Sequence, residues 1–271
     1  MIELLAPALV ACLLLACILS YFGLHVLLRE VIFVDLALAQ LAALGAAVGH
    51  LLADHTDSFS TYLYSFAFTL AGATIFALAR PARTRLPQEA LIGIVYGVSA
   101  ALVILLVSKS ALDRDEVESM LTGRLLFAEW GEIGSMALLF AVVAVLHFTL
   151  RHEFLDISER SRTHASPTRR QKLLDFVFYA SFGVVVTSSV QLSGVLVVFG
   201  LLIVPASCAA IYFANIFSRL LAAGLIGTIS CCAGIAGSAL WDLPTGAAVV
   251  AALGVAFAMA VAGSIFERTS S

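Results

Sequence analysis

The sequence carries little charge for its length. Of its 271 residues, 12% are Asp, Glu, Lys or Arg, whereas 61% are hydrophobic. A soluble domain cannot enclose that share of hydrophobic residues beneath a hydrated surface, and the mean hydropathy of +1.04 makes the same point. We therefore predict an all-α polytopic membrane protein, because a helix satisfies its own backbone hydrogen bonds inside the hydrocarbon.

The sequence also lacks the motifs of several enzyme classes. Its two lysines, Lys109 and Lys172, do not end a G-x-x-x-x-G-K-[ST] phosphate-binding loop. The metalloprotease pattern H-E-x-x-H and the hydrolase pattern G-x-S-x-G do not occur either. We expect a chain that is not an enzyme and holds no permanent cofactor, so that any ATP is hydrolysed by a partner subunit.

Apolar stretches divide the chain into membrane spans. A helix of about 17–25 apolar residues crosses the hydrocarbon core of a bilayer. Nine such stretches are predicted, or eight if the two that meet near Gln191 form one fused or broken helix. They cover residues 4–28, 31–53, 59–79, 88–108, 133–150, 173–190, 192–213, 217–240 and 244–266.

Basic residues predict the orientation of these spans. Lys and Arg concentrate on the cytoplasmic side of membrane proteins. With nine spans, the side that carries most of the 15 basic residues holds the C-terminus. The N-terminus is therefore expected outside the cell and the C-terminus in the cytoplasm.

Two hydrophilic segments interrupt the spans of what we expect to be a single transmembrane domain over residues 1–271. Residues 109–132 are acidic and are predicted to form an outer loop or a short re-entrant helix. Residues 151–172 form the only sizeable hydrophilic insertion on the side that we expect to be cytoplasmic. A short helix tipped with Phe154, Leu155 and Ile157 would suit a groove on a soluble partner, although composition alone also describes an ordinary loop.

The most informative polar residues lie inside the span at residues 31–53. Asp35 and Gln40 are costly in hydrocarbon and are retained where they face a bundle interior, a partner or a pathway. Asp35 is a candidate for a gate or pathway, with a structural ion pair to Arg29 as the alternative. His50 and His55 near the outer end of this span are candidate metal ligands, with solvated loop residues as the alternative.

Several segments resemble a known family in the family's own order. The run from Gly23 to Gly49, which contains VDLALAQLAALG, resembles the second-helix region of the integral permeases of metal-type ATP-binding cassette (ABC) transporters, the zinc, manganese and iron importers. Further segments similar to that family are Glu89–Ser108, Glu116–Leu126, Gln191–Ala206 and Asp242–Gly246.

The resemblance implies a permease subunit of an ATP-driven importer of zinc or manganese. It implies a cytoplasmic ABC ATPase, an extracellular or periplasmic metal-binding protein and a second copy of the chain as partners, within a bacterial inner membrane and without nucleic acid. Residues 151–172 then become the segment that couples to the ATPase. Glu153, Phe154, Leu155 and Asp156 stand where the family has E-F-D-P-E.

The second span departs from the family pattern. Metal-type permeases have Asp and His four residues apart, and Leu36 and Gln40 stand at those places here. Asp35 lies one residue earlier, about 100° around the helix. We expect a transport pathway at Asp35, Ala39 and Gln40, with Asp35, His50 and His55 as the candidate metal ligands. The alternatives are a secondary transporter in which Asp35 carries a proton or sodium ion, and a membrane assembly protein without transport.

Overall fold

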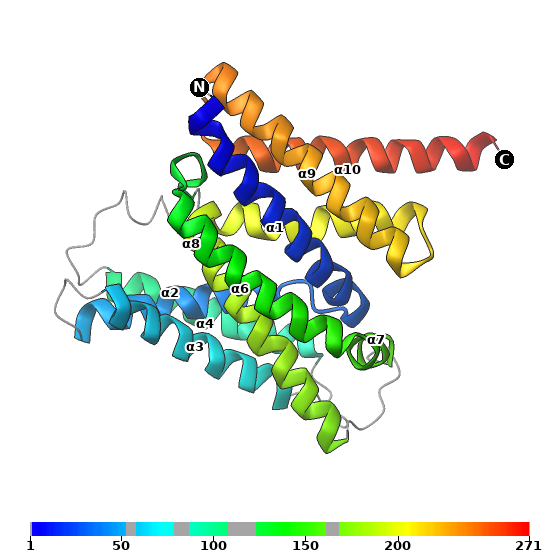
Figure 1. The fold of residues 1–271 in the computed structure, drawn as a ribbon. Helices are drawn as coiled ribbons and strands as arrows, with labels where there is room; N and C mark the ends of the chain where they lie inside the picture. The colour runs from blue at the N-terminus through cyan, green and yellow to red at the C-terminus, as the bar shows by residue number, and fades with distance from the viewer. Residues whose placement is uncertain (1, 53–57, 79–86, 108–122, 161–167, 271) are drawn as a thin grey trace. The chain divides into compact units, whose positions relative to one another are not determined.

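The computed structural model describes residues 2–52, 58–78, 87–107, 123–160 and 168–270. These residues form helices and one 3-10 turn, and no strand occurs among them. The elements are α1 (Ile2–Arg29), α2 (Val34–Leu52), α3 (Ser58–Leu78), α4 (Gln88–Val107), η1 (Leu125–Phe127), α6 (Trp130–Thr149), α7 (Arg151–Arg160), α8 (Arg169–Tyr212), α9 (Ile216–Trp241) and α10 (Thr245–Ser270) (Figure 1).

The prediction of an all-α polytopic membrane protein is confirmed. In the described ranges, 8 helices are long and apolar enough to cross a membrane. The expected spans 173–190 and 192–213 both lie in α8, which has 44 residues. Gly194 interrupts α8 with φ 78 and ψ 159, a conformation that glycine adopts without a steric cost. The two stretches that meet near Gln191 are therefore one broken helix.

The chain folds into two compact units. One unit comprises residues 1–27, 118–144 and 189–271, and the other comprises residues 28–117 and 145–188. We call them the first and the second unit. Three of the four unit boundaries fall inside α1, α6 and α8, and the fourth, between residues 117 and 118, lies outside the described ranges. The expectation of a single domain over residues 1–271 stays a prediction.

In the first unit, the end of the 109–132 segment packs on the broken part of α8. The backbone N–H of Arg124 donates to the carbonyl of Leu192 at 2.9 Å. Gly123 has φ +70, and a Cβ at this residue would lie 2.2 Å from the Ser193 carbonyl carbon. Glycine is therefore required at residue 123. The choice between a loop and a re-entrant helix depends mainly on residues 108–122, which lie outside the described ranges.

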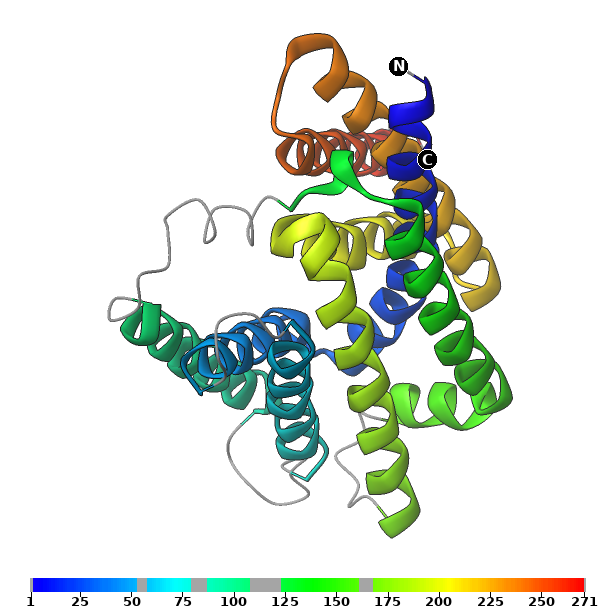
Figure 2. The ribbon, with the colours of Figure 1, turned by 60° about the vertical axis from the view of Figure 1, so that its left-hand side comes forward.

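In the second unit, α2 packs against both α3 and α4 (Figures 1 and 2). The contact with α3 is close because Gly45 has no side chain: a Cβ there would lie 2.5 Å from the carbonyl oxygen of Tyr64. Beside it, the Ser65 hydroxyl donates to the Ala42 carbonyl at 2.9 Å. Small residues at such contacts let membrane helices approach one another.

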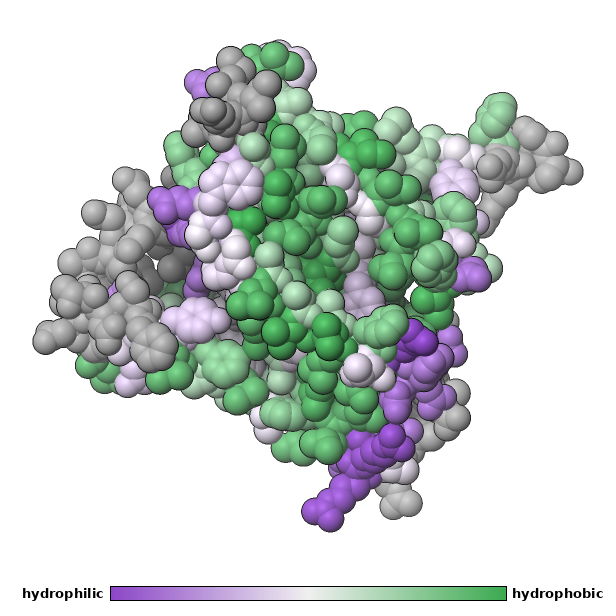
Figure 3. All heavy atoms as spheres, in the orientation of Figure 1, coloured by the Kyte–Doolittle hydropathy of each residue, from purple (hydrophilic) through white to green (hydrophobic). Residues whose placement is uncertain are grey.

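The visible surface is mainly apolar. Figure 3 shows its largest hydrophilic patch over α7 and the start of α8, and smaller ones elsewhere on the same face. Apolar side chains remain exposed on the long helices. Of the most hydrophobic 18-residue stretch of α4, only 11% is buried within the chain. This distribution suits helices that face lipid and a short helix, α7, that faces water.

Candidate functional site

The first turn of α2 positions Asp35. Arg29 ends α1, and Glu30 follows in the left-handed region with φ 57. A short turn follows before α2 begins, and in it the N–H of Val34 donates to the Val31 carbonyl at 3.3 Å. Asp35 therefore stands at the N-terminus of α2, where free backbone N–H groups favour a carboxylate.

Asp35 is buried and incompletely paired. Its exposed fraction is 1%, and its Oδ1 atom has no hydrogen-bond partner. A buried polar atom without a partner costs about 1–3 kcal/mol, so Asp35 is an expensive residue whose retention calls for a function.

Glu89 of α4 binds the backbone just before the first turn of α2. Its Oε1 accepts from the N–H of Phe33 at 3.2 Å, whereas its Oε2 is buried without a partner. Two carboxyl groups from α2 and α4 thus meet at the start of α2, each with one unpartnered oxygen. The resemblance to the family includes the segment Glu89–Ser108, but the sequence did not predict that Glu89 lies beside the first turn of α2.

The other predicted residues of this span lie elsewhere on α2. Ala39 is buried and lies one turn after Asp35 on the same face. Gln40 is half-buried and lies about 140° from Asp35 around the helix axis. His50 is in the last turn, about 22 Å along the helix from Asp35 at 1.5 Å per residue. His55 lies outside the described residues.

Asp35 and His50 therefore cannot bind one ion together. In the ranges that the structure describes, no group of three or more His, Cys, Asp or Glu side chains is arranged to hold a metal ion. The carboxyl groups of Asp35 and Glu89 remain as oxygen donors beside α2. The roles of Asp35, Ala39 and Gln40 in a pathway, and of Asp35, His50 and His55 as ligands, stay predictions.

Arg29 forms its ion pair with a residue other than Asp35. Its Nη1 atom forms an ion pair with Oδ1 of Asp175 at 2.8 Å, and both side chains are buried. The structural alternative for Asp35, an ion pair with Arg29, is therefore wrong. The sequence did not predict this pairing because the two residues are 146 positions apart, whereas Lys172 lies three positions from Asp175.

The helix α7 places its apolar side chains inside its own chain. Phe154 is fully buried and Ile157 is 3% exposed. The Phe154 ring stacks on His147 with centroids 4.5 Å apart and meets Phe178 edge to face at 5.9 Å. The prediction that Phe154 and Ile157 seat in a partner's groove is therefore wrong. An amphipathic helix buries its apolar face against the nearest hydrophobic surface, which here is α8.

The outward face of α7 is polar. His152, Asp156 and Glu159 are exposed, and Glu153 and Leu155 are partly exposed. Of the four residues expected to couple to an ATPase, Glu153, Leu155 and Asp156 are thus accessible, whereas Phe154 supports the helix from within. This face can contact a partner through charge and shape, not through an inserted aromatic ring.

The fold and this site define a polytopic helical membrane protein with buried charges at the α1–α2 turn and a short amphipathic helix between long apolar ones. The model of the ABC 3 transport family matches residues 1–264. The chain belongs to the ABC 3 transport family.

Comparison with known proteins gives three further similarities. The chain is 26% identical over 261 residues to an uncharacterized membrane protein of Synechocystis sp., covering 96% of this chain and 90% of that protein. Its fold is similar to a chain of PsaBC from Streptococcus pneumoniae in complex with Fab, with a TM-score of 0.76, 18% identity and coverage of 95% and 90%. It is also similar to an inward-facing transporter assigned to the metal-chelate ABC type, with a TM-score of 0.69, 18% identity and coverage of 95% and 85%.

Proposed function

We propose that this chain is the membrane-spanning permease subunit of an ATP-driven importer of a divalent metal ion, zinc or manganese. The observation that carries the proposal is the family match over residues 1–264, and the fold similarity to the metal-chelate type ABC transporter supports it. The chain has no phosphate-binding loop, so a separate cytoplasmic ABC ATPase supplies the energy. The metal is the cargo and not a resident cofactor.

The proposed complex has the permease as a homodimer in the bacterial inner membrane, with a metal-binding protein outside the cell. The distribution of basic residues supports an outer N-terminus and a cytoplasmic C-terminus. In that orientation α7 faces the cytoplasm and presents Glu153, Leu155 and Asp156 to the ATPase. ATP binding moves α7, and the permease alternates between outward-open and inward-open states.

The carboxyl groups near α2 favour manganese over zinc as cargo. Carboxylate oxygens suit Mn²⁺, whereas zinc sites prefer imidazole and thiolate ligands. Asp35 and Glu89 offer oxygens with no hydrogen-bond partner. Ala39 stands one turn after Asp35, so the helix offers no imidazole at that place. Weak binding by oxygens also suits an ion that must leave the site.

The test is transport by the purified complex. The chain is reconstituted in liposomes with its ATPase and binding protein, and uptake of Mn²⁺ and Zn²⁺ is followed with and without ATP. The proposal expects uptake that requires ATP and stops when the phosphate-loop lysine of the ATPase is replaced. Vectorial transport by the chain alone, without any ATPase, would overturn it.

A second candidate function rests on the unpartnered oxygen of Asp35. A buried carboxyl in a membrane helix is the usual carrier of a proton or sodium ion in secondary transporters. The same liposomes distinguish the two functions, because a secondary transporter moves its solute under a proton or sodium gradient without ATP. A chain that moves nothing under either condition would support the remaining alternative, an assembly protein.

A further inference from the structure

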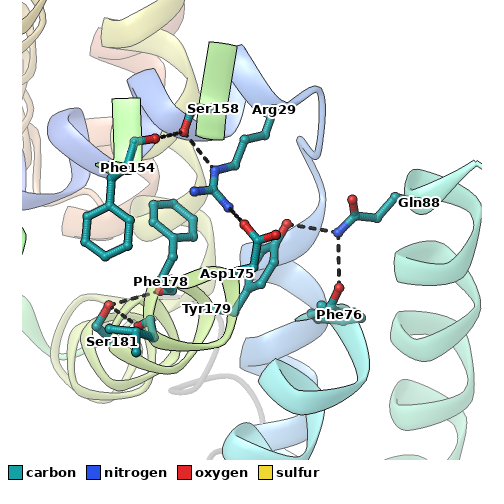
Figure 4. A network of polar contacts seen from close by, with 10 residues as sticks. Arg29, Phe76, Gln88, Phe154, Ser158, Asp175, Phe178, Tyr179 and Ser181 are labelled. Atoms are coloured by element: carbon teal, nitrogen blue, oxygen red, sulfur yellow. Dashed lines mark hydrogen bonds and ion pairs between the residues drawn. The ribbon is translucent and has the colours of Figure 1, made fainter. Parts of the chain in front are cut away.

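The helix α7 is tied to the end of α1 by one side chain. The Nε of Arg29 donates to the Ser158 hydroxyl of α7 at 2.9 Å, and that hydroxyl donates to the Phe154 carbonyl at 2.7 Å (Figure 4). The Ser158 side chain is fully buried. Displacement of α7 must therefore move Arg29 or break a buried hydrogen bond to a charged group, which is stronger than one between neutral groups.

The same guanidinium is fixed on α8. Its Nη1 pairs with Asp175 at 2.8 Å, and its Cζ lies 3.8 Å from the centre of the Phe178 ring. Arginine suits this place because its planar fork donates in two directions while its face stacks on an aromatic ring. Lysine has a single ammonium group and cannot keep all three contacts.

The polar contacts continue to the starts of α2 and α4. Tyr179 follows Phe178 in α8, and its hydroxyl accepts from Nε2 of Gln88 at 2.9 Å (Figure 4). The next residue, Glu89, accepts from the N–H of Phe33 just before α2. Through the backbone, Arg29 is six residues from Asp35. Every one of these contacts lies within the second unit.

Unsatisfied polar atoms concentrate at this place. Among the described residues, four buried side-chain atoms have no hydrogen-bond partner, and three of them belong to Arg29, Asp35 and Glu89. Folded proteins contain few such atoms. Three of the four lie around the turn that joins α1 and α2, so this is the part of the described chain where buried polar groups are least satisfied.

We propose that Arg29 is a positioning residue that transmits movement of α7 to the first turn of α2, where Asp35 lies. The proposal rests on the proposed function of α7 as the segment that meets the ATPase. Arg29 itself does not contact the cargo. Close packing around it means that a shift of α7 is passed on and not absorbed.

The test uses two mild variants, Ser158→Ala and Arg29→Lys. The first removes the hydroxyl that joins α7 to Arg29 and leaves the ion pair with Asp175. Arg29→Lys keeps the positive charge and removes the planar guanidinium that donates in two directions. The matched control is Thr187→Val, which deletes a buried hydroxyl that bonds Thr69 at 3.2 Å in the same unit, away from α7.

The first readout is amide hydrogen exchange of the full-length chain in nanodiscs, without any ATPase. We expect exchange in the peptide that covers residues 30–37 to rise several-fold in Ser158→Ala and Arg29→Lys and to stay unchanged in Thr187→Val. Faster exchange in α7 alone, with residues 30–37 unchanged, overturns the proposal. So does an equal rise in the control.

The second readout is the number of ions moved per ATP hydrolysed by the reconstituted complex. We expect each variant to lower this ratio about five-fold while ATP hydrolysis continues, and the double variant to be no worse than Arg29→Lys alone, because both changes break the link between α7 and Arg29. Additive losses, or a fall in hydrolysis with an unchanged ratio, overturn the proposal. A wild-type complex without ATP-driven transport refutes the proposed function instead, and hydrogen exchange still decides the role of Arg29.

Discussion

Two aspartates of the second unit are buried to the same degree and have opposite surroundings. Asp175 is fully buried and forms an ion pair with Arg29. Asp35 is 1% exposed and leaves Oδ1 without a partner. A buried carboxylate with an ion-pair partner is stabilised by that partner, whereas an incompletely paired one in a membrane protein marks a site where something binds or moves. Burial alone does not separate the two, but the partners do.

The strongest test of this comparison removes the partner of Asp175. Arg29→Ala leaves a buried carboxylate unpaired, and we expect the free energy of unfolding to fall by about 3–5 kcal/mol. The measurement is denaturant unfolding of the purified protein in detergent. Arg124→Ala is the control, because the Arg124–Glu132 pair is partly exposed and such pairs contribute about 0–1 kcal/mol. Equal losses in both variants would contradict the distinction.

The contact of α2 with α3 gives the next largest effect. In Gly45→Ala the new Cβ would lie 2.5 Å from the Tyr64 carbonyl oxygen, and we expect a loss of about 1–3 kcal/mol in the same unfolding assay. Gly97→Ala in α4 is the control, since nothing lies within 4 Å of a Cβ there. Its stability should be unchanged or about 0.5–1 kcal/mol higher, as helix propensity favours alanine. If Gly45→Ala leaves the free energy of unfolding unchanged, the contact between α2 and α3 can adjust to the larger side chain.

The function of Asp35 is tested by an isosteric change. We expect Asp35→Asn to lower metal uptake by about ten-fold or more, equivalent to about 1.4 kcal/mol, while the chain folds and binds its ATPase normally. The matched variant Asp175→Asn should instead lower the melting temperature, because Arg29 loses its counter-charge. Unchanged uptake in Asp35→Asn, or a melting temperature that falls as far as in Asp175→Asn, would make Asp35 structural.

The smallest effect on stability is expected on the exposed face of α7. Asp156→Ala should change the free energy of unfolding by no more than about 0.5 kcal/mol. The affinity of the Asp156→Ala variant for the ATPase should fall several-fold, as measured by co-purification or by binding to the immobilised ATPase. An ATPase that binds Asp156→Ala with wild-type affinity would place the contact elsewhere on the chain.

The helical class and the spans followed from the sequence because hydrocarbon imposes one solution on long apolar stretches. The number of helices was harder to predict. The stretches at 173–190 and 192–213 meet with almost no polar residue between them, and only the conformation of Gly194 shows how they join. Gly93 and Gly97 have the G-x-x-x-G spacing that is typical of close helix contacts, yet nothing in the described chain lies within 4 Å of a Cβ at either residue.

The candidate site was less predictable than the fold. Asp35 stood out because its charge is expensive in a membrane helix. Its neighbour Glu89 and the ion pair of Arg29 with Asp175 depend on contacts between segments far apart in sequence, which one sequence without homologues does not reveal. The amphipathic pattern of α7 was recognised, but pattern alone does not tell whether Phe154 packs inward or on a partner.

The inward packing of Phe154 bears on how this chain is to be inhibited. A synthetic decoy copying residues 151–160 would have ten residues, too few for a stable helix in water, and its aromatic ring would lack the cradle that holds it. A blocking compound must instead imitate the charged outer surface on a rigid scaffold. Phe154 is therefore the wrong starting point for the design of such a ligand.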